Sequence, residues 1–124
     1  MIGYVTIGTN DYDRARKFYD AVLAALGGKR TMEFDGRIQG YGNGSSPVMF
    51  AVAKPYNEKS ATAGNGTMVA LVAPSREAVD RVHADALKHG ASDEGAPGLR
   101  GDTFYGAYFR DPDGNKICVF YTGQ

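Results

Sequence analysis

The chain repeats one plan of hydrophobic and turn residues at an interval of 64 positions. In each half a short strand-like segment, at 5–7 and again at 69–71, leads through a polar cap into an amphipathic helix. The first apolar stripe consists of Ala15, Phe18, Tyr19, Val22, Leu23 and Leu26, and the second of Val79, Val82, His83, Ala86 and Leu87. Glycines at 27–28 and at 90 end the two helices. This pattern restricts the chain to folds built from two equivalent units.

Three strand-like stretches follow each helix. They lie at 30–34, 37–41 and 47–53 in the first half, and at 91–94, 103–110 and 116–121 in the second, where the first of the three is weak. We therefore predict a single α+β domain over residues 1–124. It consists of a βαβββ module at 1–53, a polar linker at 54–66 and a second βαβββ module at 67–124.

One face of each predicted sheet lies under its helix, and the other face is free. Alternation turns Val5 and Ile7 toward the first helix, so Tyr4 and its repeat Met68 project from the opposite faces. Cys118 projects in the same way from the last strand. Two such sheets that curl toward each other form a cupped, mixed β-sheet cleft with the helices outside. We expect a ligand to bind in this cleft.

Charge and hydropathy exclude several classes of partner. The chain has 14 basic and 14 acidic residues, so no basic surface for nucleic acid or anionic lipid is expected. The longest apolar run, at 48–53, is too short to cross a bilayer, and the opening MIGYVTIG lacks the pattern of a signal peptide. The single cysteine cannot form an intrachain disulfide. We expect a cytoplasmic protein without nucleic-acid or membrane partners.

Three stretches together resemble a known superfamily. They are the opening strand with TNDYDRARKFYDAVLAALG, its recurrence GTMVALVAPSREAVDRVHADALKHG, and the most specific of the three, FYGAYFRDPDGNKICVF. The chain resembles the glyoxalase / bleomycin resistance / extradiol dioxygenase superfamily, also called the vicinal oxygen chelate fold. This resemblance implies a pair of βαβββ modules, a cupped binding site and a homodimer. In metal-using members the site holds a divalent ion.

The resemblance also indicates where a metal would be bound. Metal-using members take His, Glu or Gln ligands from the first and last strands of each module. On this chain the corresponding positions are Tyr4, Phe50, Met68 and Cys118. These residue types are not a usual ligand set for a catalytic divalent ion. We therefore predict a site without metal or other cofactor, in which Cys118 is a small buried hydrophobic residue.

Aromatic residues are the stronger indication of a binding site, because eight Tyr and six Phe lie mostly in the predicted strands. Arg37, Gln39 and Tyr41 share one strand face, which either anchors an anionic group in the cleft or faces solvent. With the positions above, the candidate ligand-binding residues are Tyr4, Phe50, Met68, Cys118, Arg37, Tyr41, Tyr108 and Phe120.

The commonest catalytic side chain is missing from the predicted cleft. His83 falls on the edge of the second helical stripe, and His89 falls in the last turn of that helix. Asp111 and Asp113 belong to the turn DPDGN, where their carboxylates bond nearby backbone.

Three hypotheses follow from these patterns. The first is a metal-free protein that binds a small organic molecule in an aromatic cleft. The alternative is a lactoylglutathione lyase-like or dioxygenase-like metalloenzyme with a rearranged metal site. A third is a dimerising interaction domain with a vestigial cleft. A homodimer is expected in addition, because open sheet faces and edge strands need to be covered.

Overall fold

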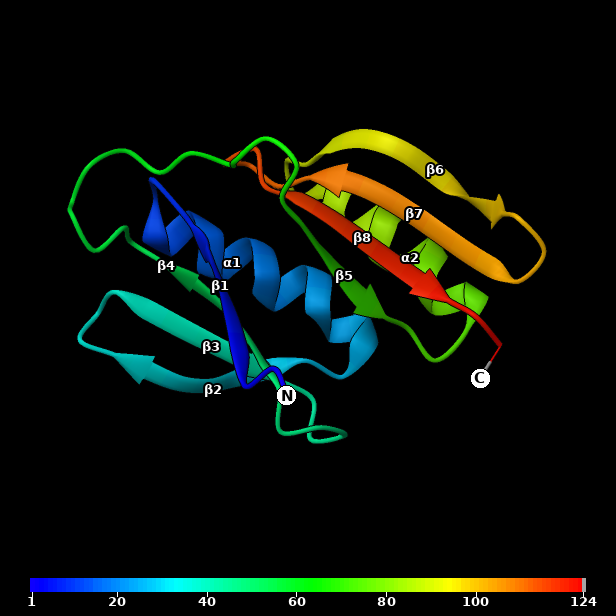
Figure 1. Ribbon diagram of the computed structural model, residues 1–124, viewed down its shortest axis with the longest axis horizontal. Coiled ribbons are helices and arrows are strands. Elements are labelled where there is room, and N and C mark those ends of the chain that lie inside the picture. Colours follow the sequence, from blue (N-terminus) through cyan, green and yellow to red (C-terminus); the bar gives the residue numbers. More distant parts are fainter. Residues whose placement is uncertain (124) are drawn as a thin grey trace.

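The computed structural model describes residues 1–123 and contains two four-stranded sheets, each with a helix on one face (Figure 1). The first sheet and its helix consist of β1 (Tyr4–Gly8), α1 (Tyr12–Val22), β2 (Lys29–Phe34), β3 (Ile38–Gly42) and β4 (Met49–Ala53), with a short 3₁₀ turn η1 (Leu23–Leu26) after α1. The second sheet and its helix consist of β5 (Met68–Val72), α2 (Arg76–Lys88), β6 (Ser92–Arg100), β7 (Phe104–Arg110) and β8 (Lys116–Tyr121).

The two sheets have the same topology. Their strand orders are β1-β4-β3-β2 and β5-β8-β7-β6, and the first strand of each pairs in parallel with the last. The remaining neighbours are antiparallel. The predicted α+β fold of two βαβββ units is therefore confirmed. Helices cover one face of each sheet and leave the other open.

Polar caps begin both helices, as the sequence pattern predicts. Asp11 Oδ1 accepts a hydrogen bond from the backbone N–H of Arg14 at 3.0 Å. In α2 the same role belongs to Ser75, whose Oγ accepts from the N–H of Ala78 at 3.1 Å. Each cap satisfies one of the backbone donors that the first turn of a helix leaves free. None of the helices in residues 1–123 is long and apolar enough to cross a membrane.

The strand β6 is longer than the sequence pattern predicts. Only 91–94 was expected, whereas the strand runs from Ser92 to Arg100 and contains two register shifts against β7. Pro97 is tolerated because β6 is an edge strand, where one row of backbone groups needs no partner. The Arg100 guanidinium stabilises this irregular pairing by donating to the carbonyl oxygens of Ala96, Gly98 and Gly106, each at 2.8 Å.

The two halves share one hydrophobic core between the helices and the sheets. Phe18 of α1 packs against Phe109 of β7, with ring centroids 6.2 Å apart. Val79 and Val82 of α2 are completely buried in the same cluster. The helices also contact each other, and Figure 1 shows them on the same side of the two sheets. The open faces of both sheets therefore lie on the other side.

The turn DPDGN joins the second half to the first. Asp111 Oδ1 accepts from the N–H groups of Asp113 and Asn115, which confirms its predicted role in the turn. The prediction was wrong for Asp113, because its carboxylate accepts from Thr9 Oγ1 at 2.6 Å and from Arg14 Nη2 at 2.9 Å instead of from the backbone of the turn. The loop of one module is thus hydrogen-bonded to the start of the helix of the other.

Candidate functional site

The open face of the first sheet carries exposed apolar side chains. Register places Tyr4 beside Met49 and pairs Ile38 with Phe34 on the same face. Tyr4 is 65% exposed and Phe34 is 61% exposed, values that are high for large apolar residues in strands. Tyr4 therefore lies on the open face, as its alternation with Val5 predicts.

The open face of the second sheet has a continuous set of apolar and aromatic groups. Register aligns Ala70, Cys118 and Tyr108 across β5, β8 and β7, and it places Val72 beside Phe120. Met68 lies on this face as well, next to Lys116. Met68, Cys118, Tyr108 and Phe120 thus share the face on which the sequence placed them.

Two phenylalanines form a stacked pair on this second face. The rings of Phe104 and Phe120 are 5.1 Å apart between centroids and nearly parallel, with an interplanar angle of 11°. Gly106 pairs with Phe120 in register, two residues after Phe104 on β7, and has no side chain to interfere. A Cβ atom at this glycine would come within 2.6 Å of the Phe104 ring. The glycine is therefore needed for the stack.

Tyr108 lies between two cations. The Arg100 Cζ atom and the Lys116 Nζ atom are each 5.5 Å from the centroid of the Tyr108 ring. Cations at this distance from an aromatic ring are attracted by its negative face. The arrangement gives the open face of the second sheet a positively charged rim around a flat aromatic surface.

Cys118 lies beneath these groups and is only 1% exposed. Burial raises the pKa of the Cys118 thiol above its ordinary value, and a hydrogen bond with Tyr108 offsets only part of this effect. At neutral pH the group is therefore a thiol rather than the thiolate that acts as a nucleophile or a metal ligand. Its burial agrees with the packing role predicted from the sequence.

Two of the predicted cleft residues face the helix instead. Phe50 packs against Tyr19 of α1, with ring centroids 4.9 Å apart. Tyr41 pairs with Phe50 in register, and its Oη donates to Arg16 O and Asp20 Oδ1, both at 3.0 Å. The placement of both residues in the cleft was wrong. The physical reason is the register of β4, in which Met49 and Ala51, not Phe50, share the open face with Tyr4.

Arg37 is not on a strand face, neither one that looks into the cleft nor one that faces solvent. It precedes β3, and its Nη2 donates to Pro55 O at 2.9 Å in the linker. Its guanidinium also lies 5.6 Å from the centroid of the Tyr56 ring. Arg37 thus contacts the linker, whereas Gln39 and Tyr41 are buried in the sheet.

The side chains at the positions that the resemblance assigns to metal ligands are not a usual ligand set for a divalent ion. On the open faces these positions carry a phenol, a thioether and a buried thiol, from Tyr4, Met68 and Cys118. Within residues 1–123 no group of three or more His, Cys, Asp and Glu side chains is close enough to bind a metal. His83 is buried between α2 and β6, with Nε2 3.0 Å from Asp93 Oδ1. This donor set is unsuited to the metal chemistry of the superfamily.

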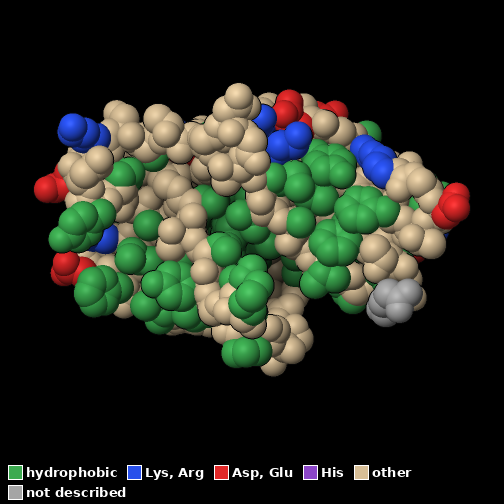
Figure 2. All heavy atoms as spheres, in the orientation of Figure 1, with side chains coloured by type: hydrophobic (Ala, Val, Ile, Leu, Met, Phe, Trp, Pro, Cys, Tyr) green, Lys and Arg blue, Asp and Glu red, His purple; other side chains and the backbone are tan. Residues whose placement is uncertain are grey.

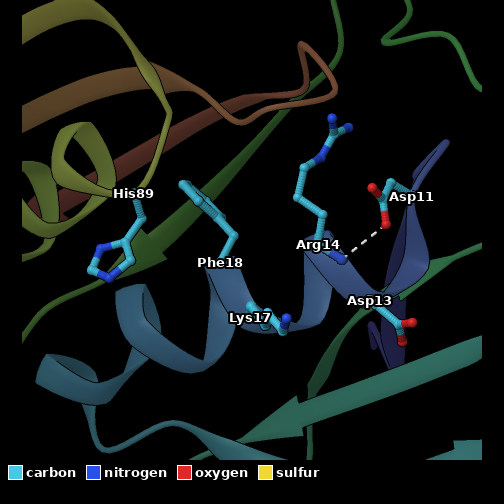
Figure 3. Close-up of a pocket in the computed structure, with 6 residues that line it drawn as sticks. All are labelled: Asp11, Asp13, Arg14, Lys17, Phe18 and His89. Carbon is cyan, nitrogen blue, oxygen red and sulfur yellow. Dashed lines mark hydrogen bonds between the residues drawn. The ribbon is translucent and has the colours of Figure 1, made fainter.

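Three surface pockets lie away from the Tyr108 region. One of about 390 Å³ is beside the start of α1 and is lined in part by Phe18 and His89. Figure 3 shows that its side chains point in different directions rather than converging on one position. The other two, of about 520 and 480 Å³, lie along the linker. The sequence did not predict these linker pockets, because residues 54–66 have no periodicity.

Comparison with known proteins identifies the family. The family model for the Glyoxalase/Bleomycin resistance protein/Dioxygenase superfamily matches residues 1–119. The chain belongs to this superfamily. Among curated proteins, none matches.

Solved structures agree with the superfamily assignment. A glyoxalase/bleomycin resistance protein from Albidiferax ferrireducens T118 is 37% identical, with a TM-score of 0.88 and 98% of each chain covered. A superfamily enzyme from Burkholderia phytofirmans PsJN has a TM-score of 0.76 at 22% identity, with 97% of each chain covered. A lactoylglutathione lyase from Agrobacterium tumefaciens has a TM-score of 0.69 at 20% identity, covering 98% of this chain and 92% of that one. The last two show the likeness of the fold alone.

Proposed function

We propose that this superfamily member binds a small organic molecule on its open aromatic faces without using a metal. The observation that carries the proposal is the open face of the second sheet. There Tyr108 and the Phe104–Phe120 stack form a flat aromatic surface above the buried thiol of Cys118. Flat aromatic surfaces bind planar or apolar groups, and the Tyr108 hydroxyl can orient a polar group of the ligand.

A second copy of the chain completes this site in our proposal. Figure 2 shows hydrophobic side chains gathered over both sheets on the open side of the molecule. Tyr4, Phe34 and Val72 are each more than half exposed there. Contiguous apolar surface of this kind is typical of an interface, and a symmetric partner would turn an open face into an enclosed cleft. We therefore propose a homodimer, located in the cytoplasm as the single cysteine suggests.

The alternative is a metalloenzyme resembling lactoylglutathione lyases or dioxygenases. Membership of the superfamily favours it, since the superfamily includes such enzymes. The chemistry of Tyr4, Met68 and Cys118 is against it, because these side chains supply no usual set of ligands. Catalysis at the open face would therefore need acid–base groups other than histidine.

A ligand screen tests the proposed function. Purified protein would be titrated with small aromatic molecules, first neutral and then charged, while its melting temperature is recorded. Binding to the native state raises the melting temperature by mass action. Phe120→Ala should abolish the shift by removing half of the stacked pair. Leu99→Ser is the matched control, because Leu99 is exposed on β6 and pairs with Tyr105, not with the open-face residues. Equal shifts in both variants would contradict the proposal.

A further inference from the structure

The linker between the modules is fixed in place by the first module. Lys54 N donates to Arg37 O at 2.9 Å, which ties the start of the linker to the turn before β3. Further along, Ala61 N donates to Asn10 Oδ1 at 2.6 Å, and Asn10 Nδ2 donates back to Ala61 O at 3.3 Å. A Cβ atom at Gly8 would lie only 3.0 Å from Ala61 Cβ, so the linker also packs closely on β1. These contacts hold the linker in one position against the first module.

The linker borders an open surface pocket of about 520 Å³ that is rich in positive charge. We call it the linker pocket, and its polar lining includes Thr9, Asn10, Arg37, Lys54, Glu58 and Lys59. Three of these side chains are cations and one is a carboxylate. Within residues 1–123, none of the three cations is in an ion pair with a carboxylate. Their charge is therefore available to a ligand.

Two of the cations are held at the pocket by other contacts. Arg37 donates one hydrogen bond to Pro55 O, and its guanidinium lies over the Tyr56 ring. The other N–H donors of the guanidinium can therefore bind a ligand. Lys54 Nζ lies 5.6 Å from the centroid of the Tyr12 ring. Preorganised cations lose less conformational entropy when they bind an anion than mobile ones do. The nearby carboxylate of Asp113 is already occupied by Thr9, Asn10 and Arg14.

A neighbouring pocket has almost no charge. It measures about 480 Å³ and shares Lys54, Pro55 and Ser60 with the linker pocket. Its lining includes Thr6 and Ile38, together with Tyr56 from the linker. Hydroxyl and apolar groups dominate it, which suits the uncharged part of an organic molecule.

We propose that the linker pocket binds the oxyanion group, a carboxylate or a phosphate, of a small organic molecule whose uncharged part lies in the neighbouring pocket. Arg37 supplies the planar donor pair that oxyanions bind best, and Lys54 and Lys59 supply further charge. This site is separate from the Tyr108 surface, because its residues come from the first module and the linker. Because the neighbouring pocket includes Thr6 and Ile38 from the open face of the first sheet, the inference extends the proposed binding on the open faces, but it does not rest on the Tyr108 surface.

Titration of the full chain with four probes tests this site. The probes are phenyl phosphate, benzoate, inorganic phosphate and the neutral benzyl alcohol, with affinity measured from amide chemical shifts. Phenyl phosphate or benzoate should bind about tenfold more tightly than benzyl alcohol, as expected for one or two hydrogen bonds to a charged group. Inorganic phosphate should bind more weakly than phenyl phosphate, because it leaves the neighbouring pocket empty. The shifts should include Asn10, Lys59 and Ser60.

Two matched variants decide whether the charge of the pocket is responsible. Lys59→Gln removes an exposed cation that lines the pocket, whereas Lys88→Gln removes an exposed cation at the end of α2. We expect Lys59→Gln alone to weaken the binding of the anionic probes, by about fivefold. Equal effects of the two substitutions, or anionic probes that bind no better than benzyl alcohol, would overturn the proposal. If binding of the anionic probes depends on Phe120 but not on Lys59, the linker-pocket proposal is wrong and the proposal for the Tyr108 surface stands. If binding depends on Lys59 but not on Phe120, the linker pocket is supported and the Tyr108 surface is not.

Discussion

Tyr19 in α1 donates a hydrogen bond from its Oη to Asp111 Oδ2 at 2.7 Å, and both groups are buried. The bond connects the helix of the first module to the turn DPDGN of the second. Burial, together with the negative charge of Asp111, raises the pKa of Tyr19 well above its ordinary value, so the phenol remains a donor. The two modules are thus coupled by a specific polar contact as well as by their shared core.

Replacing Tyr19 by Phe should lower the free energy of unfolding by about 1–3 kcal/mol, because a buried carboxylate oxygen loses a donor. Urea unfolding at neutral pH measures the change. Tyr56→Phe is the control, since Tyr56 is almost fully exposed and its hydroxyl can bond water in either state. A loss in Tyr19→Phe no larger than that in the control would show that the bond contributes little.

Replacing Gly106 by Ala should separate the Phe104–Phe120 stack. The new Cβ would come within 2.6 Å of the Phe104 ring, which must then move away. We expect a stability loss of about 1 kcal/mol and changed ring-current shifts at Phe120, measured by NMR. Gly3→Ala is the control, because nothing lies within 4 Å of a Cβ atom there. Unchanged shifts at Phe120 would contradict the role assigned to this glycine.

Periodicity in the sequence predicted most of the fold, because both helices have one apolar stripe and several strands alternate clearly. It failed for β4, MFAVA, where every residue is apolar and no alternation shows which face is buried. Alternation could therefore not correct the placement of Phe50, which came from the resemblance to the superfamily. Tyr41 was misplaced because the strand face that it shares with Gln39 was expected to look into the cleft or toward solvent, whereas its hydroxyl bonds to Arg16 and Asp20 in α1.

The sequence predicted only some of the residues of the two candidate sites. Tyr108 and Phe120 were identified because they are aromatic residues of predicted strands. The linker pocket was not, because it depends on bonds between Asn10 and Ala61, which are far apart in the chain. Arg37 was recognised as a possible anion anchor, but its partners in the linker could not be read from local pattern.

Stability should fall as the pH rises above about 10. Burial, and next a hydrogen bond to Glu33, raise the pKa of Tyr12 from 10.0 to about 12. The unfolded chain therefore loses this proton first, so the stabilisation is complete below pH 10 and is lost as the pH approaches 12. Urea unfolding between pH 8 and 11 measures the slope, which should be smaller in Tyr12→Phe. The same slope in both proteins would show that Tyr12 does not contribute.

A homodimer should be found at micromolar concentration. The apolar open faces need to be covered, and Val72 of β5 is 66% exposed on one of them. Light scattering of the wild-type chain should give twice the chain mass of 13.3 kDa. Val72→Lys should shift the protein toward the monomer, while Leu87→Lys, an exposed position on α2, should not. A wild-type mass of 13.3 kDa alone would contradict the dimer.

Metal content distinguishes the binding protein from the metalloenzyme. The open-face positions that the resemblance assigns to metal ligands hold Tyr4, Met68 and Cys118, and an incompletely coordinated ion is costly in such apolar surroundings. We expect purified protein to contain no stoichiometric divalent metal, and chelators to leave its melting temperature unchanged. Cys118→Ala should cost only about 1 kcal/mol, because it removes one small buried sulfur atom from a packed site. Elemental analysis of both proteins provides the measurement. One Zn²⁺ or Ni²⁺ per chain, bound by the wild type and lost in Cys118→Ala, would mean that Cys118 is a ligand and would favour the metalloenzyme.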